Sequence, residues 1–347
     1  YPDGDATQNY GRVCERCHTS TGAKNYLTDP SAYDRTANDL SYLEAGQREM
    51  IYCWACHSDN SGNLRDPGYV TLIDVNDSVG NFFGGVDPVE KTVTYQGVAV
   101  AIPDQGASNV CLACHGGGGN MDTARSSRFV GHHAPAGGSL FPELVHMGGE
   151  FPDQDYTVPA DFAFKLYGHA TIENPCVTCH MVDGETMNHT FAIMEEDELG
   201  AVTLPTIGVC NTCHTPGGPY EVTVEMLEEE EAGYVESGEL LGQLLANAAG
   251  YTNYLATDFT VADITAAADN AYYAYQNRLY VEEEKGGYAH NRYYVKQLLF
   301  DSIDVMMDGT MDGAITFSAQ MIADYPEAYA WLQNEEGATV RPDPTSH

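Results

Sequence analysis

The arrangement of the cysteines constrains this chain more than any other feature. All ten occur in five pairs with the spacing C-x-x-C, numbered here motifs 1 to 5: Cys14/Cys17, Cys53/Cys56, Cys111/Cys114, Cys176/Cys179 and Cys210/Cys213. A histidine directly follows every pair: His18, His57, His115, His180 and His214. With 12 histidines in 347 residues, chance would place one after a given pair only about once in thirty. The five repeats therefore point to one shared chemical requirement.

The pattern C-x-x-C-H is the attachment sequence of c-type haem. Two thiols at this spacing can each form a thioether with one vinyl group of a single porphyrin, and the next histidine then reaches the iron as its proximal ligand. A zinc ribbon needs no histidine after each pair, and a thioredoxin-like motif would occur once. A disulfide framework would not repeat the pattern either. The sequence predicts five covalently bound haems c and leaves no cysteine for disulfides.

The histidines outside the motifs are the candidates for the sixth position of each iron. They are His132, His133, His146, His169, His189 and His290, together with His347, which is the last residue and is expected to fray. Six candidates are enough to close five irons with histidine on both faces, an arrangement suited to electron transfer. Four of them lie between motifs 3 and 4, so this segment is expected to donate ligands to several haems.

Two alternatives concern these distal ligands. In an extended segment, the adjacent His132 and His133 would point to opposite faces and serve two haems. Alternatively, one of them, with His133 slightly favoured, ligates iron while the other binds a propionate. Met147, Met181 and Met187 also lie near motifs, and methionine ligation would raise the reduction potential.

The charge balance excludes several classes of partner. Lys and Arg number 15 against 51 Asp and Glu, a formal net charge of −36. Such a chain is repelled by nucleic acid and by anionic membranes, and no run of 18 apolar residues predicts a membrane span. The first residues lack a secretory leader, so an exported chain would already have lost it. The acidic surface suits cationic partners but opposes self-association unless salt or cations screen it.

All five motifs lie in residues 1–220, which are expected to form a pentahaem-binding region. Few helices and strands are expected in this region. A helix is predicted over residues 39–51. Residues 70–75 and 92–100 are rich in β-branched side chains and predict strands of a small insertion at about 69–102. The other parts of this region are expected to be irregular, because haem rings fill the core.

Residues 221–347 are expected to form an acidic helical region. Apolar residues at helical spacing predict helices over residues 258–284 and 291–307. A Gly-Gly break separates them, so they are expected to pack as an antiparallel hairpin. His290 stands at the start of the second helix, from where it would reach a haem. The chain beyond residue 335 is expected to be loop or disorder.

Two stretches of the chain carry a family resemblance. Cys176-Val177-Thr178-Cys179-His180-Met181, with His169 upstream and His189-Thr190-Phe191 downstream, resembles haem-binding stretches of multihaem c-type cytochromes. Ala289-His290-Asn291 resembles the start of the distal-ligand helix of pentahaem and octahaem cytochromes, nitrite reductases among them. The implied fold is the haem-packed multihaem cytochrome fold, with short α-helices, the small β insertion and the C-terminal helical hairpin.

The resemblance favours electron transfer over catalysis. In the nitrite reductases the catalytic haem typically has a lysine ligand, whereas every motif here has histidine. The chain also resembles extracellular cytochromes of metal-reducing microbes, including those that polymerise into haem-wired filaments. This implies conduction outside the cell, with other copies of itself, partner cytochromes or extracellular electron acceptors as partners. The alternatives are a reductase of a small nitrogen or sulfur oxyanion at one open haem, and a monomeric periplasmic carrier.

Overall fold

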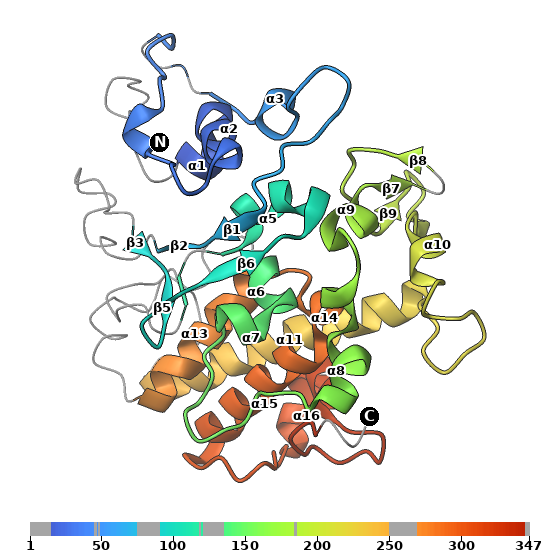
Figure 1. Cartoon of the computed structure of the whole chain (residues 1–347). Coiled ribbons are helices and arrows are strands. Elements are labelled where there is room, and N and C mark those ends of the chain that lie inside the picture. Colours follow the sequence, from blue (N-terminus) through green and yellow to red (C-terminus); the bar gives the residue numbers. More distant parts are fainter. Residues whose placement is uncertain are drawn as a thin grey trace. The chain divides into compact units, whose positions relative to one another are not determined.

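The structure, a computed structural model, describes residues 15–44, 47, 49–74, 91–117, 119–120, 135–183, 186–249 and 269–343. The chain divides into two compact units, and Figure 1 labels helices and strands of both. Unit 1 comprises Tyr1–Gln154 and Leu255–Lys285, and unit 2 comprises Asp155–Tyr254 and Gly286–His347. The sequence predicted a boundary at residue 220, where the haem motifs end. These two units are defined by compactness and not by haem binding, so that boundary stays a prediction.

Short helices dominate unit 1. They are α1 (Glu15–His18), α2 (Ser20–Thr28), η2 (Arg35–Ala37), α3 (Cys53–Cys56), η4 (Gly106–Ser108), α5 (Asn109–His115), α6 (Ala136–Leu140), α7 (Pro142–Val145) and α13 (Asp269–Glu283). The side chain of Thr19 caps α2 by accepting the N–H of Gly22 at 2.9 Å. Asn277 of α13 donates to and accepts from the backbone of Gly149, which ties the later segment to unit 1.

Three short antiparallel pairs form the β insertion of unit 1. They are β1 (Tyr69–Thr71) with β6 (Ala101–Pro103), β2 (Ile73–Asp74) with β3 (Lys91–Thr92), and β4 (Thr94–Tyr95) with β5 (Val98–Ala99). Val70 lies opposite Ile102, and both are fully buried. Gln96 and Gly97 turn the chain with φ of 48° and 79°, as a two-residue hairpin requires. The predicted insertion is therefore confirmed in its described residues.

The helix predicted over residues 39–51 is wrong for residues 39–44, 47 and 49–51, which are the ones the structure describes in this range. Asp39 accepts the backbone N–H of Ser41 at 3.0 Å and its hydroxyl at 2.6 Å, a local turn that competes with helix formation. Glu49 is buried and accepts the backbone N–H of Thr21 at 2.8 Å. The described part of this segment therefore runs as turn and extended chain along α2.

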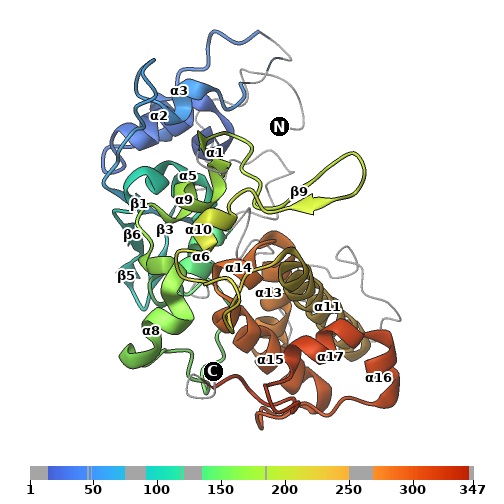
Figure 2. The same ribbon diagram turned by 90° about the vertical axis from the view of Figure 1, so that its right-hand side faces the viewer.

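Unit 2 contains two hairpins and longer helices. Its elements are α8 (Ala160–Tyr167), η5 (Gly168–Thr171), α9 (Pro175–His180), β7 (Val182–Asp183), β8 (Thr186–Met187), β9 (Glu195–Glu196), β10 (Val202–Thr203), α10 (Ile207–Cys210), α11 (Val224–Ala249), α14 (Gly287–His290), α15 (Arg292–Asp308), α16 (Ala319–Asp324) and α17 (Pro326–Leu332). Strands β7 and β8 pair antiparallel, as do β9 and β10. Helix α11 packs against both α15 and α17 (Figure 2).

Helix α15 confirms the helix predicted over residues 291–307. Asn291 caps it by accepting the N–H of Tyr294 at 3.1 Å, and Gly309 ends it with φ of 86°. Helix α13 confirms the C-terminal half of the helix predicted over residues 258–284, whose beginning lies outside the described residues. The two helices belong to different units, so the predicted hairpin stays a prediction.

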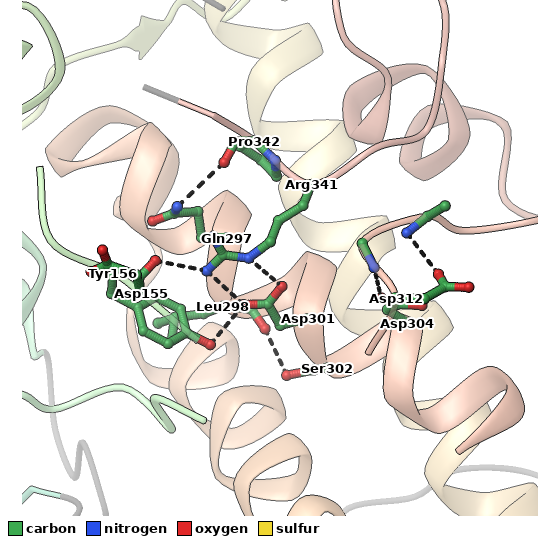
Figure 3. Close-up of polar contacts among 12 residues, drawn as sticks. Asp155, Tyr156, Gln297, Leu298, Asp301, Ser302, Asp304, Asp312, Arg341 and Pro342 are labelled. Carbon is green, nitrogen blue, oxygen red and sulfur yellow. Dashed lines mark hydrogen bonds and ion pairs between the residues drawn. The ribbon is translucent and has the colours of Figure 1, made fainter. Parts of the chain in front are cut away.

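A buried ion pair fixes the C-terminal tail to α15. Arg341 donates from Nε to Asp301 Oδ1 at 2.8 Å and from Nη2 to Asp301 Oδ2 at 2.9 Å (Figure 3). The hydroxyl of Tyr156 donates to the same carboxylate at 2.8 Å. Burial raises the pKa of Asp301, against the opposing effect of Arg341 and Tyr156. The described part of the tail, residues 335–343, has no helix, as expected of a loop, yet Arg341 anchors it to unit 2.

Candidate haem-binding sites

Each motif lies on a single helical turn in its described residues. Motifs 1 to 4 lie in α1, α3, α5 and α9, and motif 5 begins in α10 and continues through the following turn. The N–H of His57 donates to the carbonyl of Cys53 at 2.9 Å, and that of His214 donates to Cys210 at 2.8 Å. Because the histidine follows the first cysteine by four residues, helical geometry places both on the same face of the turn, where both can bind one porphyrin. Cys14 lies outside the described residues.

The cysteine thiols, which stand where the thioether sulfurs of attached haem would be, gather in two groups. In unit 1, a hydrogen bond with Cys17 and burial raise the pKa of Cys114 well above its usual value, and Cys56 adds to the effect. In unit 2, burial raises the pKa of Cys179 to about 11, with a contribution from Cys210. Unit 1 thus brings motifs 1, 2 and 3 together, and unit 2 brings motifs 4 and 5 together.

The thiols differ in how far the protein itself covers them. Cys53 of motif 2 and Cys213 of motif 5 are exposed, whereas the other described cysteines are partly buried. Cys213 lies beyond the end of α10, in a turn where its N–H donates to the carbonyl of Cys210 at 3.1 Å. The hydroxyl oxygen of its neighbour Thr212 lies 3.8 Å from its sulfur, and that hydroxyl donates to the carbonyl of Val209 at 2.7 Å.

Motif 5 ends in a short turn after α10, so the chain there supplies little cover of its own. The thioether role of Cys213 therefore stays a prediction.

A buried arginine joins motif 1 to motif 3. Arg16, within motif 1, donates from Nε to the carbonyl of Ala113 at 3.1 Å and from Nη2 to that of Thr71 at 2.6 Å. Its guanidinium carbon also lies 3.4 Å from the ring centre of Tyr26, a cation–π contact. Sequence reasoning missed Arg16, because the x positions of C-x-x-C carry no signal of their own.

A second arginine supports motif 2. Arg65 donates from Nε to the carbonyl of Ala55 at 3.1 Å and from Nη2 to that of Trp54 at 3.0 Å, the two residues between the cysteines of this motif. On the N-terminal side, the hydroxyl of Ser20 donates to the carbonyl of Met50 at 2.7 Å. These contacts fix the backbone of motif 2 against α2 and the chain that follows.

Two pairs of histidines face each other in unit 2. The ring centres of His169 and His214 lie 6.2 Å apart, and those of His180 and His290 lie 5.9 Å apart. Two imidazoles that bind one metal from opposite sides, with each nitrogen about 2 Å from it, have ring centres about 6 Å apart. Each pair joins a motif histidine to a predicted distal candidate, so both pairs have room for one iron.

Hydrogen bonds orient these rings for metal binding. The Nδ1–H groups donate to backbone carbonyls: His169 to Ala289 at 2.7 Å, His180 to Phe191 at 3.0 Å and His214 to Tyr220 at 2.7 Å. A carbonyl only accepts, so the proton resides on Nδ1 and the lone pair of Nε2 is available to a metal. In unit 1, His57 makes the same kind of bond to the carbonyl of Gly62 at 3.0 Å.

The protein also favours the neutral form of His169. Although His169 is exposed to solvent on one side, the protein atoms around it partly desolvate the ring and lower its pKa; His214 and His290 lower it further, while the hydrogen bond to Ala289 opposes them. Neutral imidazole is the form that binds metal. These residues fit axial ligation of haem iron.

Comparisons with known proteins decide the family. The sequence profile of C-type polyheme cytochrome domain 2 matches residues 2–65, which carry motifs 1 and 2. C-type polyheme cytochrome OmcB of Geobacter sulfurreducens is 34% identical over 358 residues, covering 87% of this chain and 45% of that protein. OmcC of the same species is 33% identical over 368 residues, covering 90% and 45%.

The chain is a multihaem c-type cytochrome. The resemblance recognised in the sequence is thereby confirmed, and with it covalently bound haem c as the cofactor. The cytochrome spans about half the length of the curated relatives it matches. No solved structure matches it significantly.

The remaining distal candidates of the cytochrome have other surroundings. His146 is half-buried and stacks on Tyr95, with ring centres 3.6 Å apart and planes 10° apart, and its Nδ1 lies 3.3 Å from Glu150 Oε2. His189 is exposed and meets the ring of Phe191 edge-on at 6.1 Å. His132, His133 and His347 lie outside the described residues. Their ligation stays a prediction.

Met147 has a packing role in the cytochrome. It is fully buried, and a Cβ added at Gly117 would lie 2.1 Å from its terminal methyl. A Cβ at Gly138 would lie 3.0 Å from its sulfur. The side chain of Met147 therefore fills the space left by the missing side chains of Gly117 and Gly138. Met187, by contrast, is exposed.

Two kinds of feature are absent from the described residues of the cytochrome. In that part of the chain, no group of three or more His, Cys, Asp or Glu side chains could hold a metal ion. Nor does it contain a helix long and apolar enough to cross a membrane.

Proposed function

We propose that this cytochrome transfers electrons through five c-type haems, each closed on both faces by histidine. The observation that carries the proposal is the facing of two motif histidines by two distal candidates at the separation that one iron requires. Closed iron has no position for a substrate, which favours electron transfer over reduction of an oxyanion. The five C-x-x-C-H motifs support the haem count.

The geometry favours a specific pairing of ligands. His290 would close the haem of motif 4 opposite His180, and His169 would close the haem of motif 5 opposite His214. The distal ligands for motifs 1, 2 and 3 would then come from His132, His133 and His146 of unit 1, and His189 of unit 2 stays an unassigned candidate.

The chain's own residues hold and tune these sites. When bound, haem supplies the reversible one-electron chemistry of iron. The carbonyls that accept from Nδ1 fix each imidazole plane, and proximity of Cys179 to Cys210 keeps the attachments of motifs 4 and 5 adjacent, as electron hopping requires. The buried charge of Arg16 near Cys114 would favour the reduced, less positive state of a haem attached at motif 3.

The setting proposed is extracellular or at the cell surface, with the periplasm as the alternative. Other copies of this chain in a filament, partner cytochromes and extracellular electron acceptors are the proposed partners. The net charge of −36 opposes self-assembly, so filaments are expected only where salt or cations screen it. Negative-stain microscopy across a salt series tests this: discrete particles at every salt concentration would favour the monomeric carrier.

Ligand substitution tests the central proposal. In haem-loaded protein, His290→Ala and His169→Ala are each expected to convert one low-spin haem to high-spin, seen by electron paramagnetic resonance. The double variant should convert two, and His347→Ala serves as a control expected to convert none. A high-spin haem in the unsubstituted protein would instead favour the reductase, and intact mass should show five porphyrin adducts.

A further inference from the structure

The turn from Gly286 to His290 folds a distal histidine back over a glycine. The carbonyl of Gly286 accepts the backbone N–H of Ala289 at 2.9 Å and that of His290 at 2.8 Å. These two bonds close the turn directly before α15. They bring the imidazole of His290 against the backbone of Gly286.

Gly286 leaves no room for a side chain beneath this imidazole. A Cβ built there would lie 2.8 Å from Cε1, 3.1 Å from Nδ1 and 3.4 Å from Nε2 of His290. The backbone at Gly286 has φ of −102° and ψ of 11°, which other residues also adopt in turns. The backbone conformation would therefore allow other residues at position 286. It is the close approach of the His290 imidazole that requires glycine there.

The glycine before the other distal histidine provides a contrast. Gly168 directly precedes His169, and a Cβ built at Gly168 meets no atom within 4 Å. The close approach at Gly286 is therefore particular to the position of the His290 ring.

The same turn also supports the second histidine pair. The carbonyl of Ala289 accepts the Nδ1–H of His169 at 2.7 Å. Gly287 holds the turn close to α11, since a Cβ there would lie 2.7 Å from the hydroxyl of the fully buried Tyr234. One turn therefore contacts the imidazoles that face His180 and His214.

We infer that the turn from Gly286 to His290 is a shared clamp that positions the distal ligands of two neighbouring haems, with Gly286 as the positioning residue for His290. The inference rests on the proposed ligation of motifs 4 and 5. The imidazole is the end of a flexible side chain, so a Cβ at residue 286 displaces the ring rather than the backbone. Metal–nitrogen bonds tolerate only a few tenths of an ångström, so displacement removes the ligand.

Substitution of Gly286 in the full, haem-loaded chain tests this clamp. Gly286→Ala and the larger Gly286→Val are expected to convert one haem per chain to high-spin, with valine giving the fuller conversion. Added imidazole should restore the low-spin spectrum by occupying the vacated position. Gly168→Ala is the matched control and should keep the spectrum of the unsubstituted protein. Retention of all low-spin haems in Gly286→Val would overturn the inference.

A further variant separates the effect on the ligand from general damage to the turn. Gly287→Ala presses on Tyr234 rather than on the imidazole, so it should lower the thermal midpoint without a high-spin signal. A high-spin haem in Gly287→Ala equal to that in Gly286→Ala would remove the specific role of Gly286. If His290→Ala gives no high-spin haem, the proposed ligation itself fails; if His290→Ala does and Gly286→Val does not, only the clamp fails.

Discussion

Motifs 1 and 3 of unit 1 form part of its core, whereas motif 5 of unit 2 lies beside a core made by other segments. In α1 and α5, residues inside or next to the motifs are buried, among them Glu15, Arg16 and Leu112. In unit 2, α10 of motif 5 has no buried residue, and the buried side chains concentrate on α11 and α15. The same C-x-x-C-H sequence can therefore be part of a protein core or lie beside one.

In unit 1 the motif backbones are held directly, by Arg16 and Arg65 donating to carbonyls inside or next to the motifs. In unit 2 the motif histidines contact rings from other elements. The ring of His214 lies next to that of His169 in η5, and the ring of His180 lies next to that of His290 in α14. Damage to the core should therefore have different consequences in the two units.

The largest expected effect comes from breaking the buried ion pair of unit 2. Arg341→Met leaves the carboxylate of Asp301 buried without its cation, which should cost about 3–5 kcal/mol of unfolding free energy. Hydrogen exchange read by mass spectrometry should show lost protection in peptides of unit 2 and little change in unit 1. Adding Asp301→Asn to Arg341→Met should restore part of the loss. Equal loss in both units would break the comparison.

Removal of the buried arginine of unit 1 should have the next largest effect. Arg16→Met loses two charge-assisted hydrogen bonds and the contact with Tyr26, about 2–3 kcal/mol. Protection should fall in unit 1, and the midpoint potential of one haem should move to more negative values. Lys24→Met removes an equal charge from an exposed site and is the control. An unchanged potential would show that Arg16 only holds structure.

A buried lysine makes the stability of unit 2 depend on pH. Lys296 is 3% exposed, and burial lowers its pKa from 10.5 to about 7. Between these values the unfolded chain binds more protons, so stability should rise as pH rises from about 7 to 10. Lys296→Met should be about 1–2 kcal/mol more stable than the parent at pH 7, with the lost bond to Gln333 offsetting part of the gain.

The advantage of Lys296→Met should shrink toward pH 10, measured by denaturant unfolding at a series of pH values. A constant advantage across the series would show that Lys296 keeps its proton in the folded state.

The smallest expected effect concerns a hydroxyl pair in unit 1. Tyr280 is buried on α13, and its hydroxyl bonds that of Ser139. Tyr280→Phe should cost about 1 kcal/mol, because a buried hydroxyl loses its partner. The exposed Tyr220→Phe should change the thermal midpoint by less than the error of calorimetry. Equal effects of both would show that the pair does not stabilise unit 1.

The sequence predicted much of the local secondary structure but not the tertiary contacts that stabilise it. Helix α15 and the β insertion followed from periodicity and β-branched runs. The predicted helix over residues 39–51 failed because Asp39 forms its own turn and Glu49 bonds α2. The long helix α11 is not among the predicted helices, because its acidic run Glu228–Glu231 carries no apolar periodicity, although Tyr234 and Leu241 further along it are fully buried.

The sequence alone determined the chemistry, because thioether attachment and the proximal ligand depend on spacing within five consecutive residues. Only the tertiary structure decided which distant histidine faces which motif. His169 precedes both motifs of unit 2 and His290 follows both, yet His169 faces the later motif and His290 the earlier one. Ligation depends on separation in space, and folding sets that separation without regard to order along the chain.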